Sequence, residues 1–193
     1  MAYNLGILIS GNGSNMLNII NASKEHVIKS RVVTVVSNNS NAVGLKKAEN
    51  NGIDTKIIEQ TNFNNIQDYE TTLSQYLIDR NVNLVCLAGY MKVLSKHFIK
   101  DWSNRIINIH PSLLPAFRGL NTHQRAIEKG VKYSGCTVHF VDKNIDSGKI
   151  IDQEIVRIQT FDNPHTLKKK ILMKEHKLYI KALKYLEKKN EQI

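Results

Sequence analysis

The chain has 193 residues, of which 41% are hydrophobic, 23% charged and 7% aromatic, and its formal net charge is +10. This profile is typical of a soluble globular protein, excludes a collagen-like or disordered chain, and predicts one domain over residues 1–193. The densest apolar run, Leu84–Leu94, contains Gly89 and Lys92. It is far shorter than the ~20 residues of a spanning helix, so no membrane-spanning segment is expected.

Strand-like and helical patterns alternate along the chain. Strands are expected at Leu5–Ser10, Arg31–Ser37, Asp54–Ile58, Asn83–Ala88, Ile106–His110, Cys136–Val141 and Ile150–Ile158. Helices are expected at Asn15–Ala22, Ala42–Asn51, Ile66–Asn81, Ser95–Asp101, Thr122–Lys129 and Pro164–Lys189. This alternation predicts an α/β fold with a mostly parallel, Rossmann-like sheet that carries helices on both faces. In such a sheet, ligands bind beyond the carboxyl ends of the strands.

The last two strands break the alternation. Only Asp142–Lys149 separates them, and Asp146–Gly148 within it has turn chemistry, so a hairpin or an antiparallel return at the sheet edge is expected. The two cysteines, Cys86 and Cys136, both fall in apolar strands. They have the spacing of neither a disulfide framework nor a metal site, which favours a reducing, cytoplasmic location and no metal.

A glycine-rich segment, Ser10–Asn15, joins the first strand to the first helix. Glycines let the backbone approach a ligand closely, and the amides at the start of a helix bind anions. A dinucleotide fingerprint would need glycine in place of Met16, and a Walker loop would need Gly-Lys-Ser/Thr. The segment therefore predicts a site for a small phosphate monoester, held by backbone amides and the Ser14 hydroxyl. A plain tight turn is the alternative.

Two polar residues point the same way at the end of the fifth strand. Asn108 and His110 are two residues apart, so their side chains lie on one side of the strand, which Pro111 ends. An amide donor beside an imidazole suits acyl transfer, in which Asn108 stabilises an oxyanion and His110 stabilises or moves a proton. Asp146, in the loop of the expected hairpin, is a candidate to orient His110. The alternatives are a polar pair that closes a strand and an ordinary turn residue.

The expected last helix has two different faces. Between Lys168 and Ile193 the chain carries nine Lys and three Glu, and most of these lysines share one face that we expect to be solvated. The lysines on this face are Lys170, Lys174, Lys177, Lys181, Lys184 and Lys188. The opposite, apolar face contains Glu175, whose carboxylate needs a partner because unpaired burial is costly. That partner is a bound amine, sugar hydroxyls or an internal ion pair.

Five segments together resemble the phosphoribosylglycinamide formyltransferase family, folate-dependent enzymes of purine biosynthesis, over essentially the whole chain. The matching segments are Leu8–Asn15, Leu87–Leu94, Asn108–Pro115, Gly135–Val141 and Asp146–Gly148. The resemblance implies the formyltransferase fold in a single domain, with antiparallel strands near its C-terminal part. It also separates the chain from methionyl-tRNA formyltransferases and formyltetrahydrofolate hydrolases, which carry an additional domain.

The resemblance also implies a role for individual residues. Asn108, His110 and Asp146 correspond to the catalytic trio of the family. The residues implied to bind the ribonucleotide are Gly13, Ser14, Asn15 and Glu175. The residues implied to bind the folate are Met91, Lys92, Val93, Leu94, Asp142, Lys143, Asn144 and Ile145.

The resemblance implies transfer of the formyl group of 10-formyltetrahydrofolate to the amine of 5-phosphoribosyl-glycinamide, by direct attack through a tetrahedral intermediate and without a metal. The expected partners are these two small molecules, with no nucleic acid and no membrane, for a monomer or weak homodimer in the cytoplasm. The rival hypothesis is a basic, non-catalytic ribonucleotide- or RNA-binding module that uses the lysine face of the last helix and the glycine-rich segment. It predicts salt-dependent binding of polyanions and no turnover.

Overall fold

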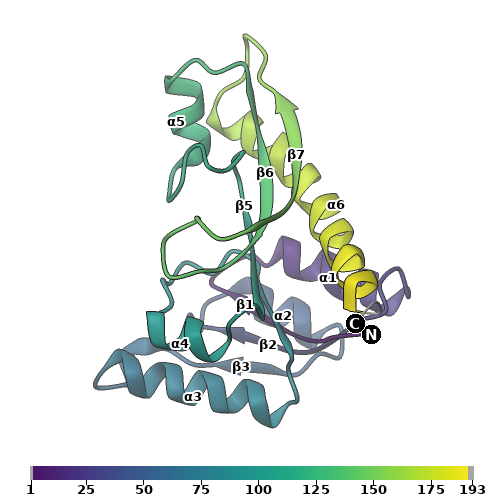
Figure 1. The fold of residues 1–193 in the computed structure, drawn as a ribbon, viewed down its shortest axis with the longest axis vertical. Helices are drawn as coiled ribbons and strands as arrows, with labels where there is room; N and C mark the ends of the chain where they lie inside the picture. The colour runs from purple at the N-terminus through teal and green to yellow at the C-terminus, as the bar shows by residue number, and fades with distance from the viewer. Residues whose placement is uncertain (1, 191–193) are drawn as a thin grey trace.

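The computed structural model describes residues 2–190, and one seven-stranded sheet runs through them (Figure 1). Its strands are β1 (Asn4–Ile9), β2 (Arg31–Ser37), β3 (Thr55–Ile57), β4 (Leu84–Leu87), β5 (Ile106–His110), β6 (Tyr133–Phe140) and β7 (Ile150–Arg157). They lie in the order β3-β2-β1-β4-β5-β6-β7. The pairs from β3 to β5 are parallel, which confirms the predicted Rossmann-like core of the sheet.

The C-terminal part of the sheet is antiparallel, as predicted. Strand β6 pairs antiparallel with both β5 and β7, and the β6–β7 pair forms the expected hairpin at the sheet edge. Strand β6 begins at Tyr133, three residues before the predicted start at Cys136. The additional residues, 133–135, pair with Ile155–Arg157 of β7. The local sequence does not indicate a strand there, because the segment contains Gly135 and glycine is uncommon in strands.

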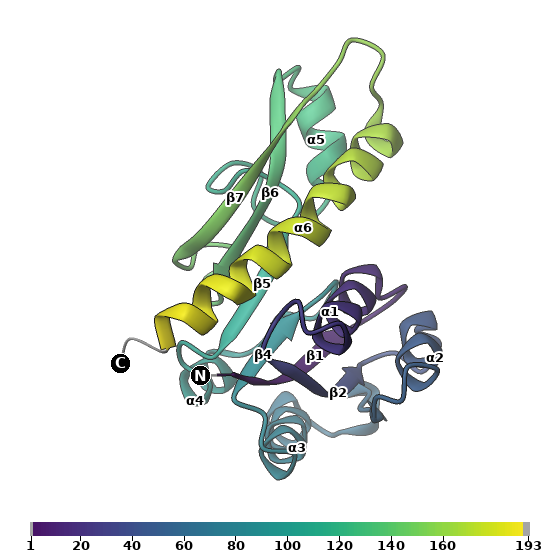
Figure 2. The ribbon, with the colours of Figure 1, turned by 90° about the vertical axis from the view of Figure 1, so that its right-hand side faces the viewer.

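The helices cover both faces of the sheet. They are α1 (Ser14–Lys24), α2 (Val43–Glu49), α3 (Ile66–Asp79), α4 (Lys96–Asp101), α5 (Thr122–Glu128) and α6 (Pro164–Asn190), with a short 3-10 helix at Gln60–Asn62 that was not predicted. Figure 2 shows α1 and α6 on one face and α3 on the other. Two separate hydrophobic clusters match this division, because side chains of α1 and α6 join one, and those of α3 and α4 the other.

The central strands are continuous apolar runs because both of their faces are covered. Every residue of β1 after Asn4 is buried, and so is every residue of β4. The edge strand β7 has a mixed pattern instead, with exposed and half-buried residues. Within the described part of the chain, no helix is both long and apolar enough to cross a membrane.

Helix α6 is fixed along the sheet by its buried face. Leu178, Tyr179 and Leu183 are fully buried, and the Tyr179 hydroxyl donates to the carbonyl of Leu87 in β4 at 3.1 Å. Near its other end, the Glu187 carboxylate accepts a hydrogen bond of 2.7 Å from the Ser30 backbone N–H. These contacts set the rotation of the helix, and thereby which of its side chains face inward.

The lysine side of α6 is mostly solvent-exposed, as predicted. Four of the six lysines are exposed: Lys177, Lys181, Lys184 and Lys188. Lys170 and Lys174 are only half-buried, because they pair with Asp162 at 2.7 Å and with Glu154 at 3.3 Å. The prediction did not include these two ion pairs, since their partners lie outside the helix.

We expect both thiols to be unreactive in the folded protein. Cys86 and Cys136 are fully buried and free, and burial raises the pKa of each thiol to about 12. At pH 8 only on the order of one thiol in 10⁴ is then a thiolate, the form that reacts. Mass spectrometry after treatment with iodoacetamide should find neither cysteine modified in buffer and both modified in denaturant. Modification in buffer at the rate of an unfolded peptide would contradict the prediction.

Candidate active site

A pocket of about 420 Å³ opens where β1, β4 and β5 end. These strands are neighbours in the sheet, so their carboxyl ends meet at one edge. The pocket is lined by Ser10, Gly11, Asn12, Gly13, Ser14, Asn15, Ala88, Gly89, Met91, Ile109, Pro111, His123, Lys168, Leu172 and Glu175. It therefore connects the glycine-rich segment to the end of β5 and to the inward face of α6.

The glycine-rich segment makes a tight turn into α1. Gly13 has a φ of 67°, in the left-handed region that glycine adopts without strain. A Cβ atom on Gly13 would lie 3.0 Å from the Cα atom of Gly44, so the turn packs closely against α2. No side chain of the described residues caps α1, which leaves its first backbone N–H groups free for an anion. These amides border the pocket beside Ser14 and Asn15.

His110 and Asp146, far apart in the sequence, are in contact. The Oδ2 atom of Asp146 lies 3.2 Å from Nδ1 of His110. The same oxygen accepts a hydrogen bond of 2.8 Å from the Gly119 backbone N–H. Asp146 has a φ of 48°, a left-handed conformation that aspartate tolerates better than most residues. The loop between β6 and β7 thus brings the carboxylate to the end of β5.

His139, on β6, connects Asn108 to Asp146. Its Nε2 atom lies 3.4 Å from the Asn108 amide nitrogen and 3.7 Å from Oδ1 of Asp146, and its Nδ1 atom lies 2.8 Å from the Phe140 carbonyl oxygen. Because a carbonyl only accepts, Nδ1 carries the proton, and Nε2 of the neutral ring accepts from Asn108. Burial lowers the pKa of His139, which favours this neutral ring. One N–H of Asn108 is thereby directed to His139, and the other remains for a ligand.

Both ring nitrogens of His110 have acceptors. Nδ1 lies beside Asp146, and Nε2 is 3.0 Å from the Phe117 carbonyl oxygen. An imidazolium donates from both of its nitrogens, so these two acceptors can stabilise a positive charge on this ring. The residue is 5% exposed and so has little freedom to turn. Its sequence neighbours Ile109 and Pro111 line the pocket, whereas His110 itself is not among the lining residues, which places the imidazole next to the pocket wall.

Glu175 faces inward from α6. It is 8% exposed, and its Oε2 atom accepts a hydrogen bond of 2.7 Å from the Asn15 side-chain amide. Burial raises the pKa of Glu175, against the opposing effects of the Asn15 hydrogen bond and the Lys168 charge. The Oδ1 atom of Asn15 is buried and has no hydrogen-bond partner within residues 2–190. Because buried polar atoms are normally paired, this oxygen and the carboxylate beside it are two acceptors that can receive hydrogen bonds from a ligand.

Three further residues belong to this region, although the sequence analysis did not select them. Lys168 lines the pocket together with Leu172 and Glu175. These three residues are spaced i, i+4 and i+7, so a helical wheel of the sequence places them on one face of α6. His123 lines it too, and its buried Nε2 atom has no partner among the described residues. Lys47 binds the outer side of the glycine-rich turn, with Nζ 2.6 Å from the Asn12 side-chain oxygen.

Burial lowers the pKa of His123, and the nearby charges of Lys168 and His110 act in the same direction. This favours the neutral ring, whose Nε2 atom is buried without a partner among residues 2–190. Nothing in the sequence marks this histidine apart from its place near the start of a helix. For metals, no group of three or more His, Cys, Asp or Glu in the described chain has the arrangement of a metal site.

The predicted folate-binding residues lie in two loops. In the first, Met91 and Val93 are 65% and 69% exposed and Lys92 is also exposed, whereas Leu94 is buried in the hydrophobic cluster beside α3 and α4. The Met91 backbone N–H donates to the Ser10 hydroxyl at 2.8 Å, which joins this loop to the glycine-rich segment. Met91 also lines the pocket.

The second loop connects β6 to β7. The Asp142 carboxylate accepts hydrogen bonds within the loop, at 3.0 Å from the Asn144 backbone N–H and at 2.6 Å from the Ser147 hydroxyl. Lys143 and Asn144 are exposed, and Ile145 is 57% exposed. Asp142 therefore shapes the loop that carries Asp146. The side chains of residues 143–145 are exposed to solvent.

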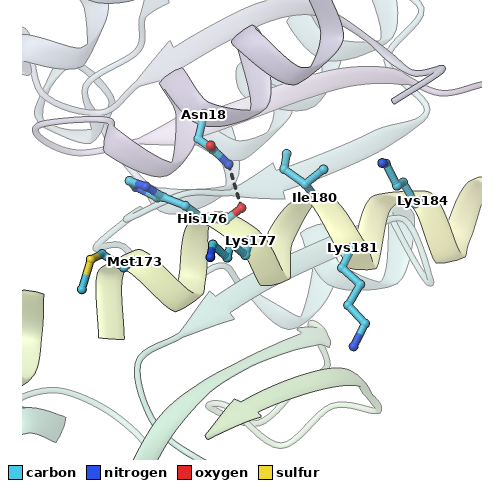
Figure 3. Close-up of a pocket in the computed structure, with 7 residues that line it drawn as sticks. All are labelled: Asn18, Met173, His176, Lys177, Ile180, Lys181 and Lys184. Carbon is cyan, nitrogen blue, oxygen red and sulfur yellow. Dashed lines mark hydrogen bonds between the residues drawn. The ribbon is translucent and has the colours of Figure 1, made fainter. Parts of the chain in front are cut away.

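A second, shallower hollow of about 670 Å³ lies on the outer side of α6 (Figure 3). It is lined by Asn18, Met173, His176, Lys177, Ile180, Lys181 and Lys184. Asn18 of α1 donates a hydrogen bond of 2.7 Å to the His176 carbonyl, and Lys181 pairs with Asp152 at 2.9 Å. The first pocket contains all four predicted ribonucleotide-binding residues, whereas this hollow contains none of them.

Removing the charges of the outer lysines should leave catalysis nearly unchanged. In a triple variant with Lys177, Lys181 and Lys184 replaced by Gln, we expect turnover within about threefold of the wild type, because solvated charges away from a site are screened. Steady-state rates at two ionic strengths would measure this. Loss of turnover in the triple variant would favour the rival model, in which this lysine face binds polyanions.

Comparisons with known proteins agree with this geometry. The formyl transferase family model matches residues 3–183. The chain is 41% identical over 93% of its length to the trifunctional purine biosynthetic protein adenosine-3 of Gallus gallus, of which it covers only 18%. It is 38% identical to the phosphoribosylglycinamide formyltransferase of Haemophilus influenzae, with 94% of this chain and 85% of that protein covered.

A solved structure is also similar. The crystal structure of the phosphoribosylglycinamide formyltransferase from Brucella melitensis superimposes with a TM-score of 0.92 and 41% sequence identity, covering 96% of both chains. This agreement extends over the parallel strands and the antiparallel C-terminal strands alike. The chain therefore belongs to the formyl transferase family, among relatives named phosphoribosylglycinamide formyltransferases.

Proposed function

We propose that this chain transfers the formyl group of 10-formyltetrahydrofolate to the amine of 5-phosphoribosyl-glycinamide, a step of purine biosynthesis. The proposal rests above all on the contact between His110 and Asp146 beside Asn108, next to a pocket whose glycine-rich turn leads into a helix without a side-chain cap. We also propose that residues 1–193 act as one formyltransferase domain, of which Met1 and residues 191–193 lie outside the described structure. A cytoplasmic monomer or weak homodimer, without nucleic-acid or membrane partners, is part of the same proposal.

The ribonucleotide binds in the pocket between the glycine-rich turn and α6. Its phosphate meets the free amides after Gly13 and the Ser14 hydroxyl, with Lys168 as a nearby cation. Its ribose hydroxyls donate to the Glu175 carboxylate and to the unpaired Oδ1 atom of Asn15. This placement is supported by the two acceptors, one of which has no hydrogen-bond partner among residues 2–190.

The folate lies between two loops. Residues 91–94 form the first, which follows β4, and residues 142–145 form the second, which leads to Asp146. The exposed apolar side chains of Met91, Val93 and Ile145 are available to the pteridine ring. Leu94 is buried, so it contributes through its backbone or through packing behind the loop. Holding both reactants at attack distance accounts for a large part of the rate in such reactions.

The chemistry is a direct transfer. The amine nitrogen attacks the formyl carbon, and the carbonyl electron pair moves to oxygen to give a tetrahedral intermediate. The free N–H of Asn108 and the charge on His110 stabilise this oxyanion. When the carbon–N10 bond breaks, the electron pair returns to N10, which takes the proton that the amine loses, carried by Asp146 directly or through water. The products are the formylated amide and tetrahydrofolate.

The decisive experiment mixes the purified protein with both substrates and follows both products, tetrahydrofolate by absorbance and the formylated ribonucleotide by mass spectrometry. We expect equal amounts of the two products. Omitting the ribonucleotide should stop tetrahydrofolate formation, because no acceptor amine is present. Tetrahydrofolate release without the ribonucleotide would indicate a hydrolase, and no product in either mixture would refute the proposal.

Replacing Glu175 with Gln should weaken ribonucleotide binding selectively. A hydrogen bond to a charged acceptor contributes ~1.5–3 kcal/mol, so the KM for the ribonucleotide should rise roughly tenfold or more. The KM for the folate should stay within about twofold, because Glu175 borders only the ribonucleotide half of the site. Initial rates with each substrate varied in turn would measure both constants. An equal rise in both would contradict this assignment.

A further inference from the structure

The loop of residues 90–95 displays three side chains to solvent between two buried ones. Met91, Lys92 and Val93 are exposed, whereas Tyr90 is 9% exposed and Leu94 is 6% exposed. An exposed loop binds a rigid ring well only when the loop itself is fixed, since ordering it on binding costs conformational entropy. The contacts that fix its two ends therefore influence any ligand it holds.

The N-terminal end of the loop is tied to α3 and to Ser10, the residue that follows β1. The Tyr69 hydroxyl, on α3, makes a buried hydrogen bond with the Tyr90 hydroxyl. Tyr69 is itself 3% exposed, and its ring packs edge-on against Phe63 at 5.7 Å between centroids. One residue further on, the Met91 backbone N–H donates to Ser10. The start of the loop is therefore held from two sides.

The C-terminal end of the loop is tied to Glu70, which follows Tyr69 on α3. Glu70 is 5% exposed, and its carboxylate accepts a hydrogen bond of 2.7 Å from the Ser95 backbone N–H and another from the Ser95 hydroxyl. Ser95 in turn caps α4, where its hydroxyl accepts from the Phe98 backbone N–H at 3.2 Å. Burying a carboxylate is costly, and these two hydrogen bonds offset the cost.

We propose that Tyr69 and Glu70, which are adjacent on α3, are positioning residues for the folate, because together they anchor both ends of the loop that binds it. This inference rests on the proposed function, which assigns the loop to the folate. Neither residue lines the pocket, so both act through Tyr90 and Ser95. The anchors keep Met91, Lys92 and Val93 in one arrangement before the pteridine arrives.

The test is a set of three variants, Tyr69→Phe, Glu70→Ala and Glu70→Gln, assayed with each substrate varied in turn. In Tyr69→Phe and Glu70→Ala we expect the KM for 10-formyltetrahydrofolate to rise about fivefold or more, and the KM for the ribonucleotide to stay within twofold. Glu70→Gln keeps one acceptor oxygen for the Ser95 N–H, so its folate KM should lie closer to the wild type. Leu77→Val, on the same helix but in the hydrophobic cluster, is the matched control for mere destabilisation.

Hydrogen exchange provides a readout that does not depend on turnover. In Glu70→Ala, the peptide containing Ser95 should exchange faster than in the wild type, and in Leu77→Val it should not. If Glu70→Ala fails to fold, Tyr69→Phe decides. A wild type that turns over while Tyr69→Phe, and Glu70→Ala where it folds, keep a wild-type folate KM would overturn the positioning role alone. A wild type without turnover would overturn the proposed function, and the folate role of the loop with it.

Discussion

Replacing His110 with Ala is expected to lower turnover ~100-fold or more while the protein stays folded. The imidazole lies between the Asp146 carboxylate and the Phe117 carbonyl, where a positive charge on the ring is favourable. Its removal takes away the charge that stabilises the oxyanion. The same loss is expected for Asn108→Ala, because His139 orients the Asn108 amide so that one N–H remains for the substrate.

Single-turnover rates and thermal unfolding would be measured for each variant. The protein offers a matched control in His97, which also lies near an aspartate, with Nε2 3.7 Å from Asp101 Oδ2 on the surface of α4. His97→Ala should keep wild-type turnover, because exposed pairs of this kind contribute little. Rates within fivefold of the wild type for His110→Ala or Asn108→Ala would refute the assignment of the replaced residue.

Replacing Asp146 with Asn is expected to lower turnover by between roughly 100-fold and 10⁴-fold, the scale seen when a carboxylate that orients a catalytic histidine loses its charge. The amide oxygen of Asn can still accept from the Gly119 N–H, so the loop should keep its shape. What is lost is the negative charge beside His110 Nδ1, which orients the imidazole, together with a carrier for the amine proton.

Asp146→Asn is checked with substrate affinities as well as rates. We expect the KM values of both substrates to stay within about threefold, because the change affects the transition state more than the bound substrates. Asp101→Asn, from the surface pair on α4, serves as the control. If turnover in Asp146→Asn equalled that of the control, the carboxylate would have only a structural role in its loop.

The fold was predictable from the sequence because its signals are local. Apolar runs separated by helical patterns place all seven strands and all six α-helices of the described chain within three residues of their observed ends. The largest difference between a predicted and an observed strand end is at Tyr133, the start of β6. It depends on pairing with the end of β7, which is not close to Tyr133 in the sequence. The 3-10 helix at Gln60–Asn62 was not predicted, since one short turn leaves no periodic pattern.

The site was predictable to a lesser degree. The alternation of side chains along a strand places Asn108 beside His110, and the helical period places Glu175 on the buried face of α6. The catalytic and binding roles of these residues stay predictions. Lys168 was not predicted to belong to the site, because it entered only the lysine count of the C-terminal segment, although it shares a face with Glu175. Two further features could not be predicted, because they arise from three-dimensional contacts. These are the hydrogen bond that favours a neutral His139 ring and the position of the Phe117 carbonyl beside His110.

The two ends of the described chain meet on the side of the sheet away from the pocket. The Tyr3 hydroxyl donates to the carbonyl of Leu186 near the end of α6, at 3.4 Å, where β1 enters the sheet, whereas the pocket lies where β1 leaves it. A polypeptide joined at either end would start on the side of the sheet opposite the pocket, since a strand of six residues spans about 20 Å. The fold is therefore suited to tandem fusion and to circular permutation, with neighbouring domains attached and the mouth of the pocket left open.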